Sequence, residues 1–139
     1  MKQIGVLSLV VIILCGISSC HKRVNGKGKK SIYAKSIEAD TSYYNFGKIC
    51  ESDNSITHKF VLKNGYKRPI LITNIVKGCH CISVDCSPKY VKPNAFFNVI
   101  VTFNPENYNG FFRKNIMVLF NDGDLFIILS IGGMVEECK

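Results

Sequence analysis

The chain has 139 residues and a formal net charge of +8, a charge that by itself is typical of nucleic-acid-binding proteins. Its distribution argues against that class, because residues 22–35 carry six of the Lys and Arg residues and no acidic residue. From Ser36 onward the chain has 11 basic and 10 acidic residues, so a domain there is nearly neutral and no nucleic-acid partner is predicted. The length suffices for one domain with a hydrophobic core and is too short for two.

The first 20 residues have the pattern of an export signal. Lys2 gives a positive start, residues 4–17 form an almost unbroken apolar run, and Ser18, Ser19 and Cys20 follow. A run of about 14 residues is shorter than the roughly 20 that a membrane-spanning helix needs. This order resembles the cleavage box of bacterial lipoproteins, whose cysteine is acylated and becomes the mature N-terminus. We therefore expect residues 1–19 to be a lipoprotein signal peptide and Cys20 to be the lipid anchor. The alternative is an ordinary secretory signal with a chance cysteine.

Residues 20–35 are predicted to be a basic, flexible tether. Lipid on Cys20 would place its lysines and arginine beside anionic head groups, where each contributes about 1 kcal/mol of attraction. The membrane is therefore a predicted partner. The expected location is the cell envelope, on the outer or inner membrane and facing the periplasm. A linker that its charge keeps soluble is the alternative, and the two are compatible.

Residues 36–139 are predicted to form one domain made only of β-strands. Alternating apolar residues and turn signals predict eight segments at 36–40, 43–49, 55–64, 69–77, 82–85, 96–103, 111–120 and 125–131. Residues 121–124, Asn-Asp-Gly-Asp, indicate a hairpin turn more readily than a calcium site at Asp122 and Asp124. Short strands at this spacing predict an antiparallel sandwich of seven or eight strands, with a small barrel as the alternative.

The alternation also indicates which side chains form the core. In 55–64 and 96–103 we expect burial of the apolar side chains of one face, chiefly Phe60, Leu62, Val99, Val101 and Phe103. Lys59 lies on the opposite face and is expected to be exposed. In 69–77 the alternation places four residues on one face, namely Ile70, Ile72, Asn74 and Val76.

Several motifs follow one another in the order of a known family. They are the run 44–49 (YNFGKI), Asn64-Gly65 after its strand, the run 69–81 (PILITNIVKGCHC), Val91-Lys92-Pro93 and Thr102-Phe103-Asn104-Pro105. Over residues 38–132 the chain resembles the domain-of-unknown-function 1573 (DUF1573) family of exported bacterial proteins. The resemblance implies an immunoglobulin-like sandwich that acts as a binding or scaffold module. Where the family usually has Pro-Gly-Glu, this chain has Pro93-Asn94-Ala95, and the turn is expected to survive because Asn tolerates positive φ.

Five cysteines remain after the signal and the anchor, namely Cys50, Cys79, Cys81, Cys86 and Cys138. In an oxidising compartment this number predicts one or two disulfides and at least one free thiol, with the connectivity open.

The best candidates for metal binding or thiol chemistry are Cys79, His80 and Cys81, which stand where the family usually has Cys-Gly-Cys. Two thiolates and an imidazole suit Cu(I) or Zn²⁺, and a Cys-x-Cys pair suits disulfide exchange. In an extended strand, however, His80 points away from both cysteines, so the three converge only in a turn. We predict structural cysteines and no metal site, with metal handling or disulfide exchange as the alternative. The two differ in whether Cys79 or Cys81 pairs with one of the other three cysteines.

The sequence shows no phosphate-loop, nucleophile-elbow or metalloprotease spacing, so no catalytic residue and no cofactor is predicted. Five aromatic residues are candidates for a partner surface, although a sandwich can also use them in its core and turns: Tyr43, Tyr44, Tyr108, Phe111 and Phe112. The sequence thus predicts a non-catalytic envelope lipoprotein that acts as a binding or structural module, with an unidentified protein partner.

Overall fold

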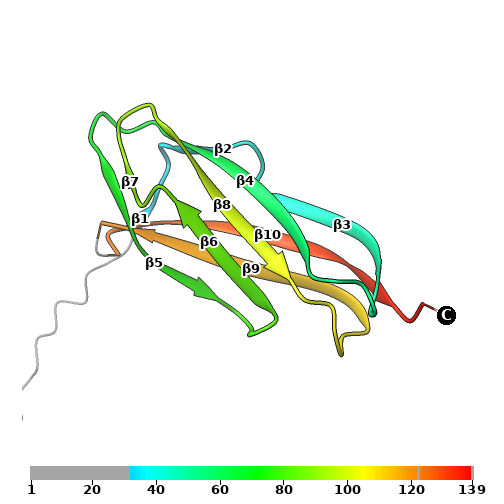
Figure 1. Ribbon diagram of the computed structural model, residues 1–139. Helices are drawn as coiled ribbons and strands as arrows, with labels where there is room; N and C mark the ends of the chain where they lie inside the picture. Colours follow the sequence, from blue (N-terminus) through cyan, green and yellow to red (C-terminus); the bar gives the residue numbers. More distant parts are fainter. Residues whose placement is uncertain (1–31, 122, 139) are drawn as a thin grey trace, which may run out of the picture.

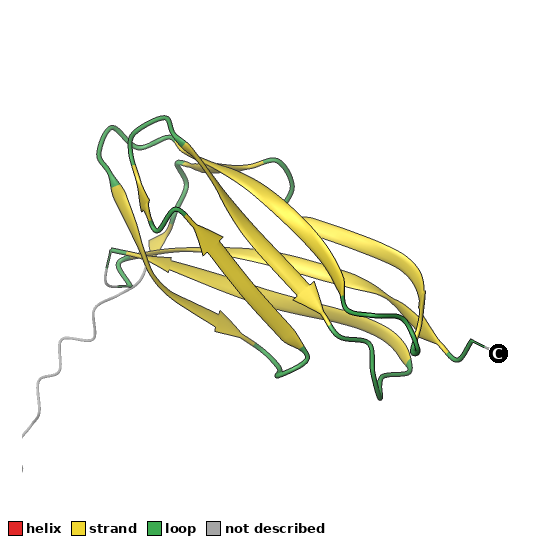
Figure 2. Ribbon diagram, viewed as in Figure 1, coloured by secondary structure: helices red, strands yellow, loops and turns green. Residues whose placement is uncertain are grey.

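The computed structural model describes residues 32–121 and 123–138, so the expected signal peptide, Cys20 and Asp122 lie outside the described residues. The described part forms ten β-strands and no helix (Figures 1 and 2). It therefore contains no helix that is long and apolar enough to cross a membrane.

The strands form two sheets that pack face to face (Figure 1). The six-stranded sheet has the order β1–β10–β9–β5–β7, with β3 also paired to β10, and it contains β1 (Ile32–Tyr33), β3 (Tyr43–Cys50), β5 (Ile70–Lys77), β7 (Tyr90–Val91), β9 (Gly110–Phe120) and β10 (Leu125–Glu136). The four-stranded sheet has the order β2–β4–β8–β6, and it contains β2 (Ile37–Ala39), β4 (Ile56–Asn64), β6 (Ile82–Ser87) and β8 (Phe96–Phe103). The predicted all-β sandwich is confirmed.

The structure has ten strands where seven or eight were predicted, because β1 and β7 have two residues each and are too short to show alternation. β1 also lies within the segment expected to be tether, since Ile32 pairs with Leu125 and Tyr33 with Phe126. A further difference from a purely antiparallel sandwich is that β1 and β3 both run parallel to β10. The chain leaves the six-stranded sheet after β1, adds β2 to the other sheet, and returns as β3 along the same edge of β10.

The core lies between the sheets and follows the predicted alternation. The five side chains expected there, Phe60, Leu62, Val99, Val101 and Phe103, are all fully buried. Rings from the two sheets meet in the core: Phe103 stacks on Phe112 with centroids 4.2 Å apart, and Phe97 meets Phe120 edge-on. The core prediction for these two strands is confirmed.

The predicted faces of β5 are wrong beyond Ile72. The register against β9 shifts between Ile72 and Asn74, so one residue is added to β5 and the side chains after it exchange faces. As a result Ile75 packs against the core, whereas Asn74 and Val76 are exposed. Strict alternation cannot anticipate a bulge, because the bulge breaks the period of two.

Asn64 holds together the loops at the end of the sandwich where β1 begins. Its side chain is fully buried, and its Nδ2 donates to three carbonyl oxygens of two loops, those of Arg68, Val91 and Lys92. The next residue is Gly65, and a larger residue would not fit there, because a Cβ at that position would lie 2.7 Å from the carbonyl oxygen of Ser36. Asn94 adopts φ 60, so the turn that the sequence was expected to preserve is present.

We predict that Phe60→Ala lowers the free energy of unfolding by about 2–5 kcal/mol, because it leaves a cavity between the sheets. Lys59→Ala is the matched control, since the neighbouring Lys59 is exposed and its loss should change stability by less than about 0.5 kcal/mol. Urea unfolding of both variants measures the difference. Equal midpoints would show that the faces of β4 are assigned the wrong way round.

Candidate functional site

The structure places the five cysteines in three different environments. Cys50, at the end of β3, is bonded to Cys138, just beyond β10, with Cα atoms 5.4 Å apart. Cys79 is bonded to Cys81 inside the turn between β5 and β6, with Cα atoms 5.3 Å apart. Cys86 is buried as a free thiol in β6. Neither Cys79 nor Cys81 is therefore paired with one of the other three cysteines.

The two disulfides differ in the length of chain that they close. The sequence separation is 88 for Cys50–Cys138 and 2 for Cys79–Cys81. Because a cross-link removes more unfolded-state entropy in a longer loop, the first is worth about 4–5 kcal/mol and the second about 1.5 kcal/mol on this relation. Cys50–Cys138 joins the C-terminal end to β3, whereas Cys79–Cys81 constrains only its own turn.

The β5–β6 turn is held by hydrogen bonds on both sides of the short disulfide. Lys77 Nζ donates to the Ile82 carbonyl oxygen at 2.6 Å, and the Asn104 N–H donates to the Cys81 carbonyl oxygen at 2.9 Å. His80, at the tip, is exposed. Residues 79–81 do meet in a turn, as their chemistry would require, but their sulfurs are bonded to each other. Across residues 32–121 and 123–138, no three His, Cys, Asp or Glu side chains are grouped so as to hold a metal ion.

Cys86 is held in its protonated form by its surroundings. Burial in the core raises the pKa of the thiol to about 11, the nearby negative charge of Asp85 acts in the same direction, and Lys89 opposes both. A thiol with this pKa contains almost no thiolate at neutral pH and is a poor nucleophile. Cys86 therefore acts as a small apolar core residue.

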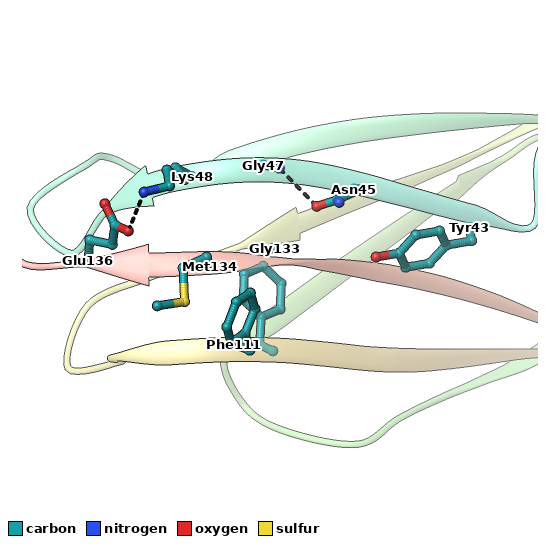
Figure 3. Close-up of a pocket in the computed structure, with 9 residues that line it drawn as sticks. Tyr43, Asn45, Gly47, Lys48, Phe111, Gly133, Met134 and Glu136 are labelled. Atoms are coloured by element: carbon teal, nitrogen blue, oxygen red, sulfur yellow. Dashed lines mark hydrogen bonds and ion pairs between the residues drawn. The ribbon is translucent and has the colours of Figure 1, made fainter.

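A groove with a volume of about 670 Å³ lies where β3, β10 and β9 run side by side (Figure 3). Tyr43 stands at one end of it, and an ion pair between Lys48 Nζ and Glu136 Oε1, 2.8 Å apart, stands at the other. Between them lie Phe111 and Met134. Phe111 is 83% exposed, the largest exposed fraction among the exposed large hydrophobic residues of the described chain. The groove thus has an apolar middle and polar ends.

Glycines and a bulge make room for this groove. A Cβ on Gly132 would lie 2.6 Å from the Tyr43 hydroxyl oxygen, so only glycine permits the observed position of Tyr43. The β3–β10 register shifts between Gly132 and Met134, opposite Gly47, which adopts φ 73. The Arg113 guanidinium lies 5.0 Å from the centre of the Tyr43 ring and packs over it.

A second apolar surface, which we call the outer band, lies on the outer face of the same sheet. The register aligns Val76, Met117 and Ile128 in one row across three strands, and Leu119, Phe126 and Tyr33 in the next. Val76 and Tyr33 are each 50% exposed. A polar pair separates the outer band from the groove, because Ser130 Oγ donates to Asn115 Oδ1 at 2.8 Å.

The two ends of the sandwich carry opposite charges. At the end where β1 begins, which we call the tether end, the loops expose four basic residues, Lys67, Arg68, Lys89 and Lys92, while Glu38 and Asp124 lie at the same end. At the other end, which we call the distal end, five acidic residues gather around the Cys50–Cys138 disulfide: Glu51, Asp53, Glu106, Glu136 and Glu137. One of them, Glu136, is paired with Lys48. The groove reaches the distal end, because Glu136 both lines the groove and is one of the acidic residues of that end.

The sequence model described as "Protein of unknown function (DUF1573)" matches residues 37–135, which is most of the chain. The chain belongs to the DUF1573 family. The resemblance seen in the order of the motifs is therefore confirmed, and the groove, the short disulfide and both ends all lie within or beside the matched residues.

Solved structures show the same fold in larger proteins. A protein of unknown function from Porphyromonas gingivalis W83 has 12% identity and a TM-score of 0.60 over 70% of this chain and 46% of its own. The VesB protease of Vibrio cholerae has 12% identity and a TM-score of 0.61 over 72% of this chain and 32% of its own. The secreted serine protease VesC from the same organism has 11% identity and a TM-score of 0.52 over 66% and 21%. This chain spans less than half the length of each, and at such identity the likeness shows the fold alone. Among curated proteins, no sequence matches.

The structure separates the five aromatic residues that were candidates for a partner surface. Tyr43 and Phe111 line the groove of this DUF1573 domain. Tyr44 stacks on His58 with ring centroids 3.7 Å apart, and burial lowers the pKa of His58 although Asp40 opposes the shift. Phe112 is buried, stacks on Phe103 and also lines the groove, whereas Tyr108 is half-buried and meets Phe103 edge-on. The sequence did not single out Met134 or the Lys48–Glu136 pair, because nothing local marks residues that only the β3–β10 pairing brings together.

We predict that alkaline pH destabilises the fold through Cys86. Because its pKa is raised to about 11 in the folded chain, the thiol deprotonates first in the unfolded chain, whose reference pKa is 9.0. The stabilisation is complete below pH 9 and is lost as the pH rises toward 11. Urea unfolding between pH 8 and 11 should show a shallower loss in Cys86→Ala than in the natural chain. Parallel curves for the two proteins would contradict the assignment.

Proposed function

We propose that this DUF1573 chain is a lipid-anchored protein of the bacterial cell envelope whose sandwich binds a protein partner without catalysing a reaction. The observation that carries the proposal is the groove, with an almost fully exposed Phe111 beside Met134. Burying one such aromatic side chain contributes about 1.5–3 kcal/mol, which is the usual contribution of a central contact at an interface. The outer band extends the apolar surface of the same sheet.

The groove suits a protein segment better than a small charged ligand. Its two charged residues, Lys48 and Glu136, are already paired with each other, so neither calls for a counter-ion. Asn45 and the Tyr43 hydroxyl offer hydrogen bonds to a backbone, and Phe111 and Met134 offer contact to an apolar side chain. An apolar middle with polar ends is the usual anatomy of a protein-binding patch.

Addition of a partner strand to the β3 edge is less favoured than binding in the groove. Three N–H groups of β3 are already bonded to nearby side-chain oxygens: Tyr43 to Thr41 Oγ1, Gly47 to Asn45 Oδ1 and Cys50 to Asp53 Oδ2. Bulges and local capping of this kind protect sheet edges against pairing with another chain. The partner is therefore expected to engage side chains and not the free backbone of β3.

The opposite charges of the two ends support an orientation at the membrane. A lipid on Cys20 would leave a short basic segment before β1, so the tether end faces the bilayer. The exposed basic residues of that end, Lys67, Arg68, Lys89 and Lys92, favour contact with anionic head groups. The acidic distal end and the groove then face the envelope space, where a protein partner reaches them.

We predict that Cys20→Ala blocks lipid attachment and leaves the unprocessed precursor, because the acylated cysteine is the residue that defines the cleavage site. Cys15→Ala is the matched control, since Cys15 lies in the segment that processing removes. Detergent partitioning and intact mass measure lipid and processing together. Normal-size mature protein in the aqueous fraction of Cys20→Ala would contradict the lipoprotein assignment.

We predict that a photoreactive phenylalanine analogue at position 111 of the full chain forms one dominant cross-linked product with a protein in the native cells. The same analogue at position 96 is the control, because Phe96 is also a well-exposed phenylalanine at a strand end but lies on the other sheet. Met134→Asp should reduce the product at 111 at least about tenfold by placing a charge in the apolar middle. Equal products at both positions, or none at 111, would contradict binding in the groove.

A further inference from the structure

The Cys79–Cys81 disulfide has features of an exchangeable bond that the binding role does not explain. It closes a loop of only three residues, with a sequence separation of 2. Since entropic stabilisation by a disulfide falls with loop length, this bond adds little to the stability of the sandwich. Cys50–Cys138 already supplies the long-range cross-link. Opening the short bond should therefore leave the fold intact.

The short disulfide lies at an accessible turn. Cys79 and Cys81 are half-buried and pack against the core on one side, whereas Gly78 before them and His80 between them are exposed. A Cβ built on Gly78 would meet no atom of the chain within 4 Å apart from its immediate neighbours, so the start of the turn is open on that side. In Figure 1 the turn projects between the ends of β5 and β6, on separate elements from the C-terminal disulfide. Incoming thiols can reach such a bond, and because Cys138 is exposed as well, the difference expected between the two disulfides rests on loop length and Lys77.

A positive charge is fixed in the same turn. Lys77 Nζ donates to the Ile82 carbonyl oxygen at 2.6 Å and so bridges the two ends of the turn that holds the sulfurs. Because Lys77 precedes Cys79 by two residues in this turn, we expect its ammonium group to stabilise the thiolate that leaves when the bond opens, and a better leaving group speeds exchange. The Asn104 N–H holds the Cys81 carbonyl oxygen at 2.9 Å, so the turn keeps its shape.

The remaining free thiol does not take part. Cys86 is 8% exposed, and its side chain belongs to the core. Any exchange at the turn therefore involves only the two cysteines of the short disulfide and the thiols of an incoming molecule.

We infer that Cys79–Cys81 is a redox-active disulfide that accepts two electrons from a dithiol presented at the β5–β6 turn. One thiolate of the dithiol attacks a sulfur of the bridge, the Cys79–Cys81 bond breaks, a mixed disulfide forms and the other cysteine leaves as a thiolate. The second sulfur of the dithiol then attacks the mixed disulfide, and the donor leaves as a disulfide. Two protons pass from the donor to the two cysteines, which end as thiols.

The test is reduction of the full chain, purified in detergent without reductant, by dithiothreitol at pH 7.5. Samples are quenched over time, alkylated, and analysed by mass spectrometry for each cysteine. We expect Cys79 and Cys81 to become alkylated at least about ten times faster than Cys50 and Cys138, while circular dichroism remains unchanged. Lys77→Gln should slow this reaction several-fold, whereas the control Lys59→Gln should leave its rate unchanged.

Two outcomes would overturn the inference. One is that both disulfides open together, or only as the circular dichroism of the fold is lost. The other is that Cys50–Cys138 opens first while Cys79–Cys81 resists the reductant. The reduction experiment does not involve the groove, so its failure leaves the proposed partner binding standing. Failure of the position-111 cross-link likewise leaves this inference standing.

Discussion

The parallel pairing of β3 with β10 is the interaction on which the candidate sites depend. It runs from Ser130 to Glu136 of β10 and brings Tyr43 and Lys48 beside Met134 and Glu136, which produces the groove. It also brings Cys50 opposite Glu136, close enough for the disulfide with Cys138. The pairing is possible because Gly47, Gly132 and Gly133 allow the bulge and the close approach of Tyr43. A side chain at Gly132 would displace Tyr43 and alter the groove.

The two disulfides differ in the length of chain that they close. Cys50–Cys138 closes almost the whole domain and secures the edge at which β3 returns to the six-stranded sheet. Cys79–Cys81 lies on the turn between β5 and β6, where it closes only three residues, and Lys77 Nζ bonds across the same turn to the Ile82 carbonyl oxygen. The long cross-link is therefore suited to stability, and we propose exchange for the short one, which lies on different elements from the groove.

The sequence predicted those parts of the structure that obey a local period. β4 and β8 alternate strictly, so their buried residues, such as Phe60 and Val101, could be predicted. β5 could not, because the bulge after Ile72 exchanges its faces. β1 and β7 are too short to show a period. Cysteine connectivity and the groove depend on contacts between residues far apart in the chain, and no spacing within the sequence encodes the β3–β10 pairing that creates them.

In the proposed orientation the tether end faces the membrane and the groove faces away from it. A fluorescent aromatic amino acid at position 90 or 111 of the lipidated full chain, in vesicles with anionic lipid and a quencher on the head groups, measures this orientation. Tyr90 lies at the tether end and Phe111 in the groove, and both are exposed aromatic residues. We expect strong quenching at 90 and little at 111. Equal quenching at the two positions, or stronger quenching at 111, would contradict this orientation.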